Sequence, residues 1–137
     1  MTRIASRLCY VLTVACLLQA CTRPEELRRA EHAVAAFHEA AQRGAFKEIY
    51  AAASPEMRAA IGEDSFLGLM RAVSGKLGAY ASSELKEHRI DQQPAMTLVT
   101  LVYVSRFQQG PALERFVFKL AEDRAVLVSY NIHSPAF

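Results

Sequence analysis

An apolar repeat with helical spacing follows Pro24 and extends to Arg43. Apolar residues recur there at intervals of three and four and therefore share one helical face: Leu27, Ala30, Val34, Phe37 and Ala41. Pro24 suits the first turn of a helix, where its missing N–H is not needed. Gly44 suits the left-handed residue that commonly follows a helix. The pattern predicts a helix over residues 24–43.

Shorter helical patterns occupy residues 46–77. A second helix is predicted over residues 46–53, with Ile49 and Tyr50 turned inward. Ser54-Pro55-Glu56 then combines a capping residue, a first-turn proline and an acid, which marks a new helix start that Gly62 interrupts. A further helix is predicted over residues 64–77, where one narrow stripe carries Phe66, Leu69, Met70, Val73 and Leu77. Gly78 ends it.

The period of the pattern changes after Gly78, and four strands follow. Residues 83–91 are polar and charged, as in an exposed edge strand, and residues 96–107 are rich in Val, Thr, Leu and Tyr. Residues 113–120 alternate, with Phe116 and Phe118 on one side and Arg115 and Lys119 on the other. Residues 126–132 alternate in the same way. Short connections favour an antiparallel meander, so we expect an α+β domain with N-terminal helices on one face of a curved four-stranded sheet.

The first residues of the chain have the layout of a secretory signal peptide. Arg3 and Arg7 precede an uncharged apolar run over residues 10–18, and the small residue Ala20 stands before Cys21. Leu18-Gln19-Ala20-Cys21 resembles the lipobox of bacterial lipoproteins. The resemblance implies a signal-peptide helix, cleavage after Ala20 and acylation of Cys21. The weaker alternatives are a plain signal peptide cut elsewhere, a retained membrane helix and a buried helix of a cytosolic domain.

Lipidation of Cys21 would anchor the domain close to a membrane. Residues 1–20 would be the signal peptide, residues 21–23 the anchor with a very short tether, and residues 24–137 a single domain. Several acyl chains hold a protein essentially permanently on a bilayer. The resemblance implies three such chains in a Gram-negative host. Thr22, in place of an aspartate, then implies the outer membrane, with the domain facing the periplasm.

Charge and cysteine content exclude several classes of chemistry for the processed chain. Loss of Arg3 and Arg7 leaves 14 basic and 14 acidic residues, so the net charge is about zero and a nucleic-acid partner is not expected. Loss of Cys9 and Cys16 leaves Cys21 as the sole cysteine, which excludes an internal disulfide and a thiolate metal site. No His or acid pairs have metal-ligand spacing, and no metal or cofactor is predicted.

The mature chain also resembles small bacterial envelope proteins similar to the nuclear-transport-factor-2-like (cystatin-like) superfamily. The resemblance covers residues 24–134 and rests on these segments: residues 37–40 (FHEA), 43–50 (RGAFKEIY), 66–67, 77–78, 110–118 with Glu114-Arg115-Phe116, and 129–132 (SYNI). It implies a cone-shaped sheet wrapped by helices. Ala45 departs from the acid expected to cap the second helix, so fraying is expected there. This superfamily includes enzymes, binders and scaffolds, so the fold does not fix the function.

Candidate pocket-lining residues are His38, Tyr50, Tyr103 and Tyr130, and no catalytic residue is predicted. Spacing alone brings no pair of them together. We expect His38 to be a partly exposed residue at the edge of the first helical stripe, and the tyrosines to be core aromatics whose hydroxyls find backbone partners. The leading hypothesis is a non-catalytic envelope lipoprotein that binds a protein partner or supports an assembly. The alternatives are a binder of a small apolar ligand in the cone and a cofactor-free isomerase or dehydratase.

Overall fold

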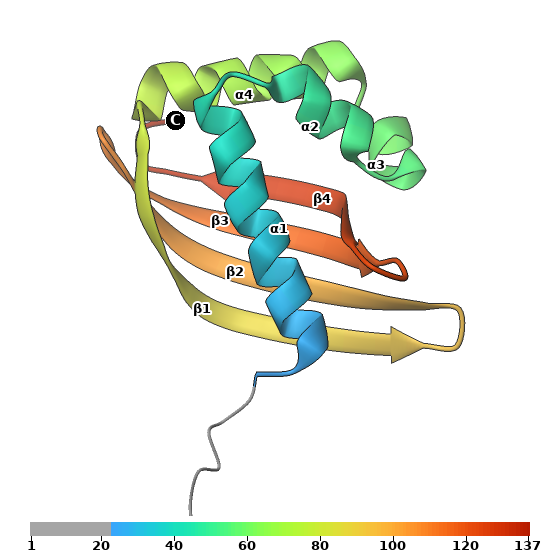
Figure 1. The fold of residues 1–137 in the computed structure, drawn as a ribbon. Helices are drawn as coiled ribbons and strands as arrows, with labels where there is room; N and C mark the ends of the chain where they lie inside the picture. The colour runs from blue at the N-terminus through green and yellow to red at the C-terminus, as the bar shows by residue number, and fades with distance from the viewer. Residues whose placement is uncertain (1–22) are drawn as a thin grey trace, which may run out of the picture.

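A computed structural model describes residues 23–137 of the chain (Figure 1). The predicted lipobox, the predicted cleavage position and Cys21 lie outside the described residues. The described part forms an α+β domain in which four helices precede a four-stranded antiparallel sheet. No helix of that part is long and apolar enough to span a membrane.

The elements follow one another with short connections. The helices are α1 Glu25–Gln42, α2 Phe46–Ala52, α3 Pro55–Ala60 and α4 Glu63–Leu77. The strands are β1 Tyr80–Gln93, β2 Met96–Phe107, β3 Gly110–Leu120 and β4 Ala125–His133. The predicted order of elements and the antiparallel meander are therefore confirmed. The expected alternation of Val126, Val128 and Tyr130 is wrong, because a register shift against β3 between Val117 and Phe118 brings Leu127 and Tyr130 into the core. The first strand is longer than expected, because its polar start at Tyr80 already pairs with the end of β2 at Phe107.

Helix caps follow the local sequence. The side chain of Ser54 accepts a hydrogen bond from the backbone N–H of Met57 at 3.1 Å, and Pro55 stands at the first position of α3. Helix α2 forms without a side-chain cap at Ala45, and the backbone N–H of Ile49 donates to the carbonyl of Ala45 at 3.1 Å. Helix α2 therefore begins at Phe46 although its N-cap residue has no polar side chain.

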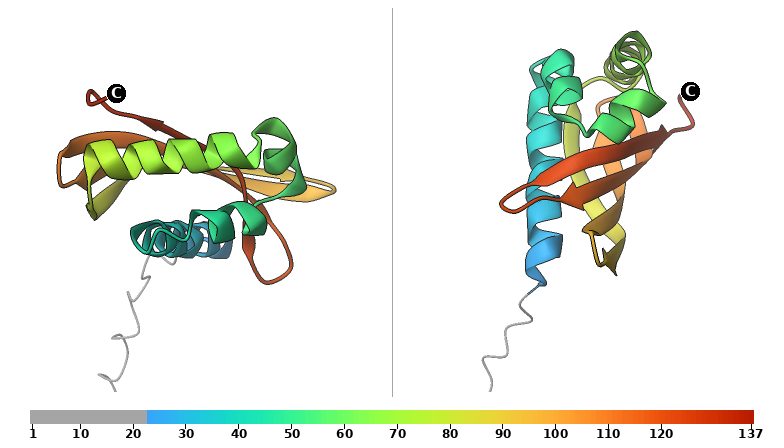
Figure 2. Two further views of the ribbon diagram at one scale, coloured as in Figure 1. Left: turned by 90° about the horizontal axis from the view of Figure 1, so that it is seen from above. Right: turned by 90° about the vertical axis from the view of Figure 1, so that its right-hand side faces the viewer.

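The helices lie on one face of the sheet. Helix α1 crosses all four strands, while α2, α3 and α4 gather toward the β4 side of the sheet (Figures 1 and 2). The core between the layers contains Phe37 and Val34 of α1, Phe66 of α4, and Leu101 and Phe116 of the sheet. Because side chains alternate along each strand, every second residue of β2 and β3 enters this core.

No helix of residues 23–137 lies on the outward face of the sheet (Figure 2). On β2 this face consists of Leu98, Thr100, Val102 and Val104, all half-buried, and it continues onto Val117 of β3. Solvated faces of antiparallel sheets are usually polar. The apolar outward face of β2 departs from that rule.

Candidate functional site

A buried carboxylate lies between α1 and the sheet. Glu114 of β3 has an exposed fraction of 0% and accepts three hydrogen bonds from side chains. Its Oε2 accepts from His38 Nε2 at 2.9 Å and from Ser105 Oγ, and its Oε1 accepts from the Tyr130 hydroxyl at 2.7 Å. Because an ionised carboxylate only accepts, the proton of the His38 contact lies on Nε2. These four residues form the Glu114 cluster.

The strand register brings the Glu114 cluster together. Glu114 lies opposite Tyr103 of β2 and Ile132 of β4, so Ser105 and Tyr130 are its diagonal neighbours on the inward face. Helix α1 places His38 above this group. The cluster therefore joins α1 to β2, β3 and β4 at one point of the core.

His38 is buried, which corrects the expectation of a partly exposed boundary residue. Its exposed fraction is 5%, and its ring stacks on Tyr80 with centroids 3.9 Å apart and 17° between the ring planes. The ring of Phe116 meets it edge-on at 5.8 Å. The helical stripe widens to include this polar residue because Glu114 supplies a buried partner for it.

The environment of the Glu114 cluster shifts the pKa values of its members. Burial acts to raise the pKa of Glu114, but the hydrogen bond and charge interaction of His38, with the hydroxyls of Ser105 and Tyr130, outweigh burial and lower that pKa below its ordinary value. Burial and the nearby carboxylate raise the pKa of Tyr130 strongly. Burial, with a smaller contribution from Glu31, raises the pKa of the neighbouring Tyr103 to about 12.

A cavity of about 440 Å³ adjoins the Glu114 cluster, and we call it the α4 pocket. Its walls are rich in aromatic side chains, including Phe46, Tyr80 and Phe107, and His38 and Tyr130 also line it. Within the Glu114 cluster, three donors occupy three of the roughly four lone-pair positions of the carboxylate. The hydrogen bonding of the cluster therefore suits a carboxylate that holds helix α1 to the sheet better than it suits a carboxylate free to act as a general base.

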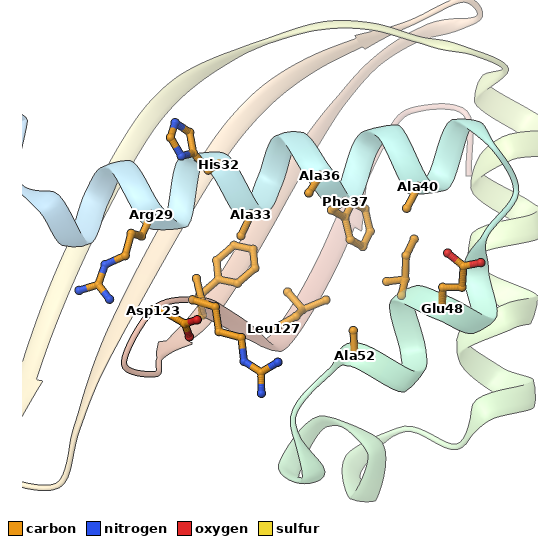
Figure 3. Close-up of a pocket in the computed structure, with 14 residues that line it drawn as sticks. Arg29, His32, Ala33, Ala36, Phe37, Ala40, Glu48, Ala52, Asp123 and Leu127 are labelled. Atoms are coloured by element: carbon orange, nitrogen blue, oxygen red, sulfur yellow. The ribbon is translucent and has the colours of Figure 1, made fainter.

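A second cavity, of about 460 Å³, lies between α1, α2 and the β3–β4 turn, and we call it the α2 pocket (Figure 3). Most of its wall is apolar and includes Ala33, Ala36, Phe37, Ala40, Ile49, Ala52, Phe118 and Leu127. The charged groups Arg29, Asp123, Arg124 and Glu48 lie around this wall. Phe37 lines both cavities and separates them.

Arg29 fixes the β3–β4 turn at one end of the α2 pocket. Its Nη1 donates to the backbone carbonyls of Ala121 at 3.2 Å and Glu122 at 3.1 Å. Its buried Nε makes no hydrogen bond with the described residues and lies 3.9 Å from the Glu25 carboxylate. The α2 pocket thus has an apolar wall and one incompletely paired donor at its edge.

The structure places the four sequence candidates in two groups. His38 and Tyr130 meet at Glu114 and line the α4 pocket. Tyr50 and Tyr103 line neither cavity: the Tyr50 hydroxyl lies 3.0 Å from the carbonyl of Ile61, and Tyr103 is buried in β2. The sequence interpretation missed Glu114. The alternation of β3 could have shown that Glu114 points inward, because Glu114 lies an even number of residues from the inward residues Phe116 and Phe118.

The residues around the two cavities do not form a metal centre. Within residues 23–137, no group of three or more His, Cys, Asp or Glu side chains could hold a metal ion. Comparison of the chain with known protein families and with curated proteins finds no match.

Proposed function

We propose that the chain is a membrane-anchored envelope lipoprotein whose domain binds a small apolar ligand in the α2 pocket. The observation that carries the proposal is the pocket itself, a cavity of about 460 Å³ with a mainly alanine, phenylalanine and leucine wall. Ligand sites are typically mostly apolar, with volumes of about 300–1,000 Å³ and a few polar groups that orient the ligand. Arg29, Arg124 and Asp123 would be those groups.

The filled centre of the domain supports a non-catalytic role. Phe37 packs against Phe116 and Tyr130, with ring centroids 5.1 Å and 4.7 Å away, so aromatic side chains occupy the middle of the layer between helices and sheet. The buried carboxylate beside them is held by three donors. We also propose that this arrangement is a filled version of the nuclear-transport-factor-2-like cone.

The proposed anchor would keep the α2 pocket near a bilayer. Helix α1 begins at Glu25, four residues after Cys21, and Arg29 is at the pocket's edge one turn further on. Acylation of Cys21 would hold this end of α1 near the headgroups of the outer membrane, on its periplasmic side. A pocket held close to the headgroups in this way would suit a ligand that partitions into membranes.

Photolabelling in native membranes tests the proposed ligand class. The probe is a long-chain alkane that carries a diazirine and a terminal alkyne, and labelled peptides are mapped by mass spectrometry. We expect labels on peptides of α1 and α2. Ala36→Trp should fill the pocket and reduce this labelling at least tenfold, because Ala36 lines the wall.

Ala35→Trp is the matched control, since both alanines are exposed on α1 but only Ala36 lines the pocket. The chain contains no tryptophan, so each variant carries a single indole. A blue-shifted emission from the Ala36→Trp variant, but not from the Ala35→Trp variant, verifies that the indole at position 36 is enclosed. Equal labelling of both variants and the parent protein, with residue 36 enclosed, would refute ligand binding in this pocket.

A second candidate function is the binding of an envelope protein partner through the outward face of the sheet. The observation that favours it is the row of half-buried apolar residues Leu98, Val102 and Val104 on β2, which no helix in the described part of the chain covers. Contiguous exposed apolar surface commonly marks an interaction site. This surface lies opposite the helices, so both functions are compatible in one domain.

A further inference from the structure

The ring of Phe37 forms the wall between the α2 pocket and the α4 pocket. Of residues 23–137, Phe37 alone lines both cavities, which have volumes of about 460 and 440 Å³. Figure 3 shows its ring between Ala36 and Ala40 of the same helix, directed into the α2 pocket. The size of this one side chain therefore determines whether the two cavities are separate.

Three neighbouring rings support the Phe37 ring on its far side. The ring of Phe116 meets it edge-on, with centroids 5.1 Å apart and 80° between the planes, and Tyr130 lies at 4.7 Å. The imidazole of His38 also meets it edge-on at 5.8 Å. Both His38 and Tyr130 donate hydrogen bonds to the buried carboxylate of Glu114. The Glu114 cluster thus holds two of the three rings against which Phe37 packs.

The two sides of the Phe37 ring differ in chemistry. On the α2 side, the neighbouring wall consists of methyl groups such as those of Ala36 and Ala40. On the α4 side, the lining includes the imidazole of His38 and the carboxylate of Glu114. An apolar chain gains little where it covers such groups, because polar groups lose solvation on burial. The ring therefore keeps an apolar occupant of the α2 pocket away from the buried ion pair.

We propose that Phe37 limits the length of the apolar chain that the α2 pocket accepts, so that the ligand is an amphiphile with one straight chain that ends at this ring. Ala33 and Ala36 present only methyl groups along α1, which leaves an unbranched path for a chain. Arg29 and Asp123 lie at the rim, where they would face the polar end. This inference rests on the proposed function and names the class of ligand.

A supported aromatic wall should discriminate sharply between chain lengths. Protein interiors are close-packed and yield little, so a chain that is too long must displace packed rings. One methylene more or less in an apolar pocket changes binding by about 10- to 200-fold. We therefore expect binding to strengthen with each added carbon until the chain reaches Phe37, and to weaken at least tenfold for longer chains.

Photolabelling of the mature lipoprotein in native membranes with chains of graded length tests the proposal. The probes are straight-chain alcohols that carry a diazirine at the end of the chain and an alkyne at the polar end. In the parent protein, labels should fall on α1 and α2 up to a limiting length. Phe37→Leu should join the cavities, raise labelling by the longest probes at least tenfold over the parent, and place new labels on Met70, Val73 and Ser74 of the α4 pocket.

Phe66→Leu is the matched control. Phe66 has an exposed fraction of 0% and lines neither cavity, so the same substitution there loosens the core without opening the wall. Its length profile should equal that of the parent. Phe37→Met is a second test variant, because methionine retains most of the apolar volume but is flexible enough to move aside. A cooperative thermal transition verifies that each variant folds, and comparison with the parent at each chain length removes the effect of partition into the bilayer.

The outcomes separate this inference from the function on which it stands. Absence of label on α1 and α2 of the parent at every chain length would overturn both. Labelled α1 and α2 with the same limiting length in the parent, Phe37→Leu and Phe37→Met would overturn the role of Phe37 and retain the ligand site. An equal shift of the profile in Phe66→Leu, or label on the α4 pocket of the parent from the longest probes, would also overturn that role.

Discussion

Glu114→Gln is the substitution that most directly tests the structural role of the buried cluster. The glutamine has the same shape but no charge, and its single carbonyl oxygen can accept from His38 and Ser105 while its amide nitrogen then faces the Tyr130 hydroxyl. Hydrogen bonds to a charged group contribute about 1.5–3 kcal/mol each, against about 0.5–1.5 kcal/mol for neutral pairs. Because three hydrogen bonds are affected, we expect a loss of about 2–4 kcal/mol in the free energy of unfolding at pH 7.

Urea unfolding of the mature chain, followed by far-UV circular dichroism, measures this loss. The chain carries Cys21→Ser, which removes the predicted acylation site. The control is Glu39→Gln, which removes a charge from an exposed position of α1 and should change the free energy of unfolding by less than about 0.5 kcal/mol. A glutamine variant at position 114 that is as stable as this control would refute the structural role of the carboxylate.

The pH dependence of the same comparison adds a second constraint. The pKa of Glu114 is lowered in the folded state, so its ionisation stabilises the fold above the unfolded-state pKa of about 4.3 and this contribution is lost as the pH falls through the folded-state pKa. The stability difference between parent and Glu114→Gln should therefore be constant from pH 7 to about pH 5 and shrink below about pH 4. A difference that is constant down to pH 2 would contradict the lowered pKa.

Three further predictions concern other parts of the chain. Cys21→Ser should abolish palmitate labelling and membrane retention, and a variant that stays labelled in the membrane fraction would disprove the lipobox assignment. The pKa of Tyr103 is raised to about 12 in the folded state, and the pKa of Tyr130 is also raised. The neutral phenols of these two residues therefore stabilise the fold at every pH up to the unfolded-state pKa of about 10. Their stabilisation is lost as the pH rises through the folded-state values, so absorbance at 295 nm should show their ionisation together with unfolding; full titration of all tyrosines in a still-folded chain would contradict burial. Ser54→Ala should destabilise the domain by about 1 kcal/mol in urea unfolding, because the backbone N–H of Met57 loses its cap, and an unchanged stability would contradict that role of the Ser54 side chain.

The helices and strands were largely predictable because local periodicity determines them. The strand over Met96–Phe107 has the bounds that its composition predicts, and the helix start at Ser54-Pro55-Glu56 forms as its capping chemistry requires. Alternation along β3 also carries the information that Glu114 points inward. A carboxylate at an inward position nevertheless conflicts with the usual exposure of acids, so the pattern alone gives no reason to assign it to the core.

The candidate site was predictable only in part. His38 and Tyr130 were among the candidates, but His38 was expected at a partly exposed boundary. Glu114 entered only as part of the resemblance, and neither it nor Ser105 was a site candidate. Their association joins one helix residue to three strands. His38 and Glu114 alone are 76 positions apart, and neither helical nor strand periodicity reports such distances. The division of the interior into two cavities by Phe37 depends on the same packing.

The sequence by itself determined the order of helices and strands, the alternation of β3, and the expectation of a lipid anchor at Cys21. Those features depend on neighbours within a few residues, where spacing and side-chain chemistry are sufficient. Only the tertiary structure decided that a buried glutamate holds His38, that an apolar cavity adjoins α2, and that Phe37 separates this cavity from a second one. The physical reason is that strand register and helix placement result from packing of the whole domain, which brings distant residues together.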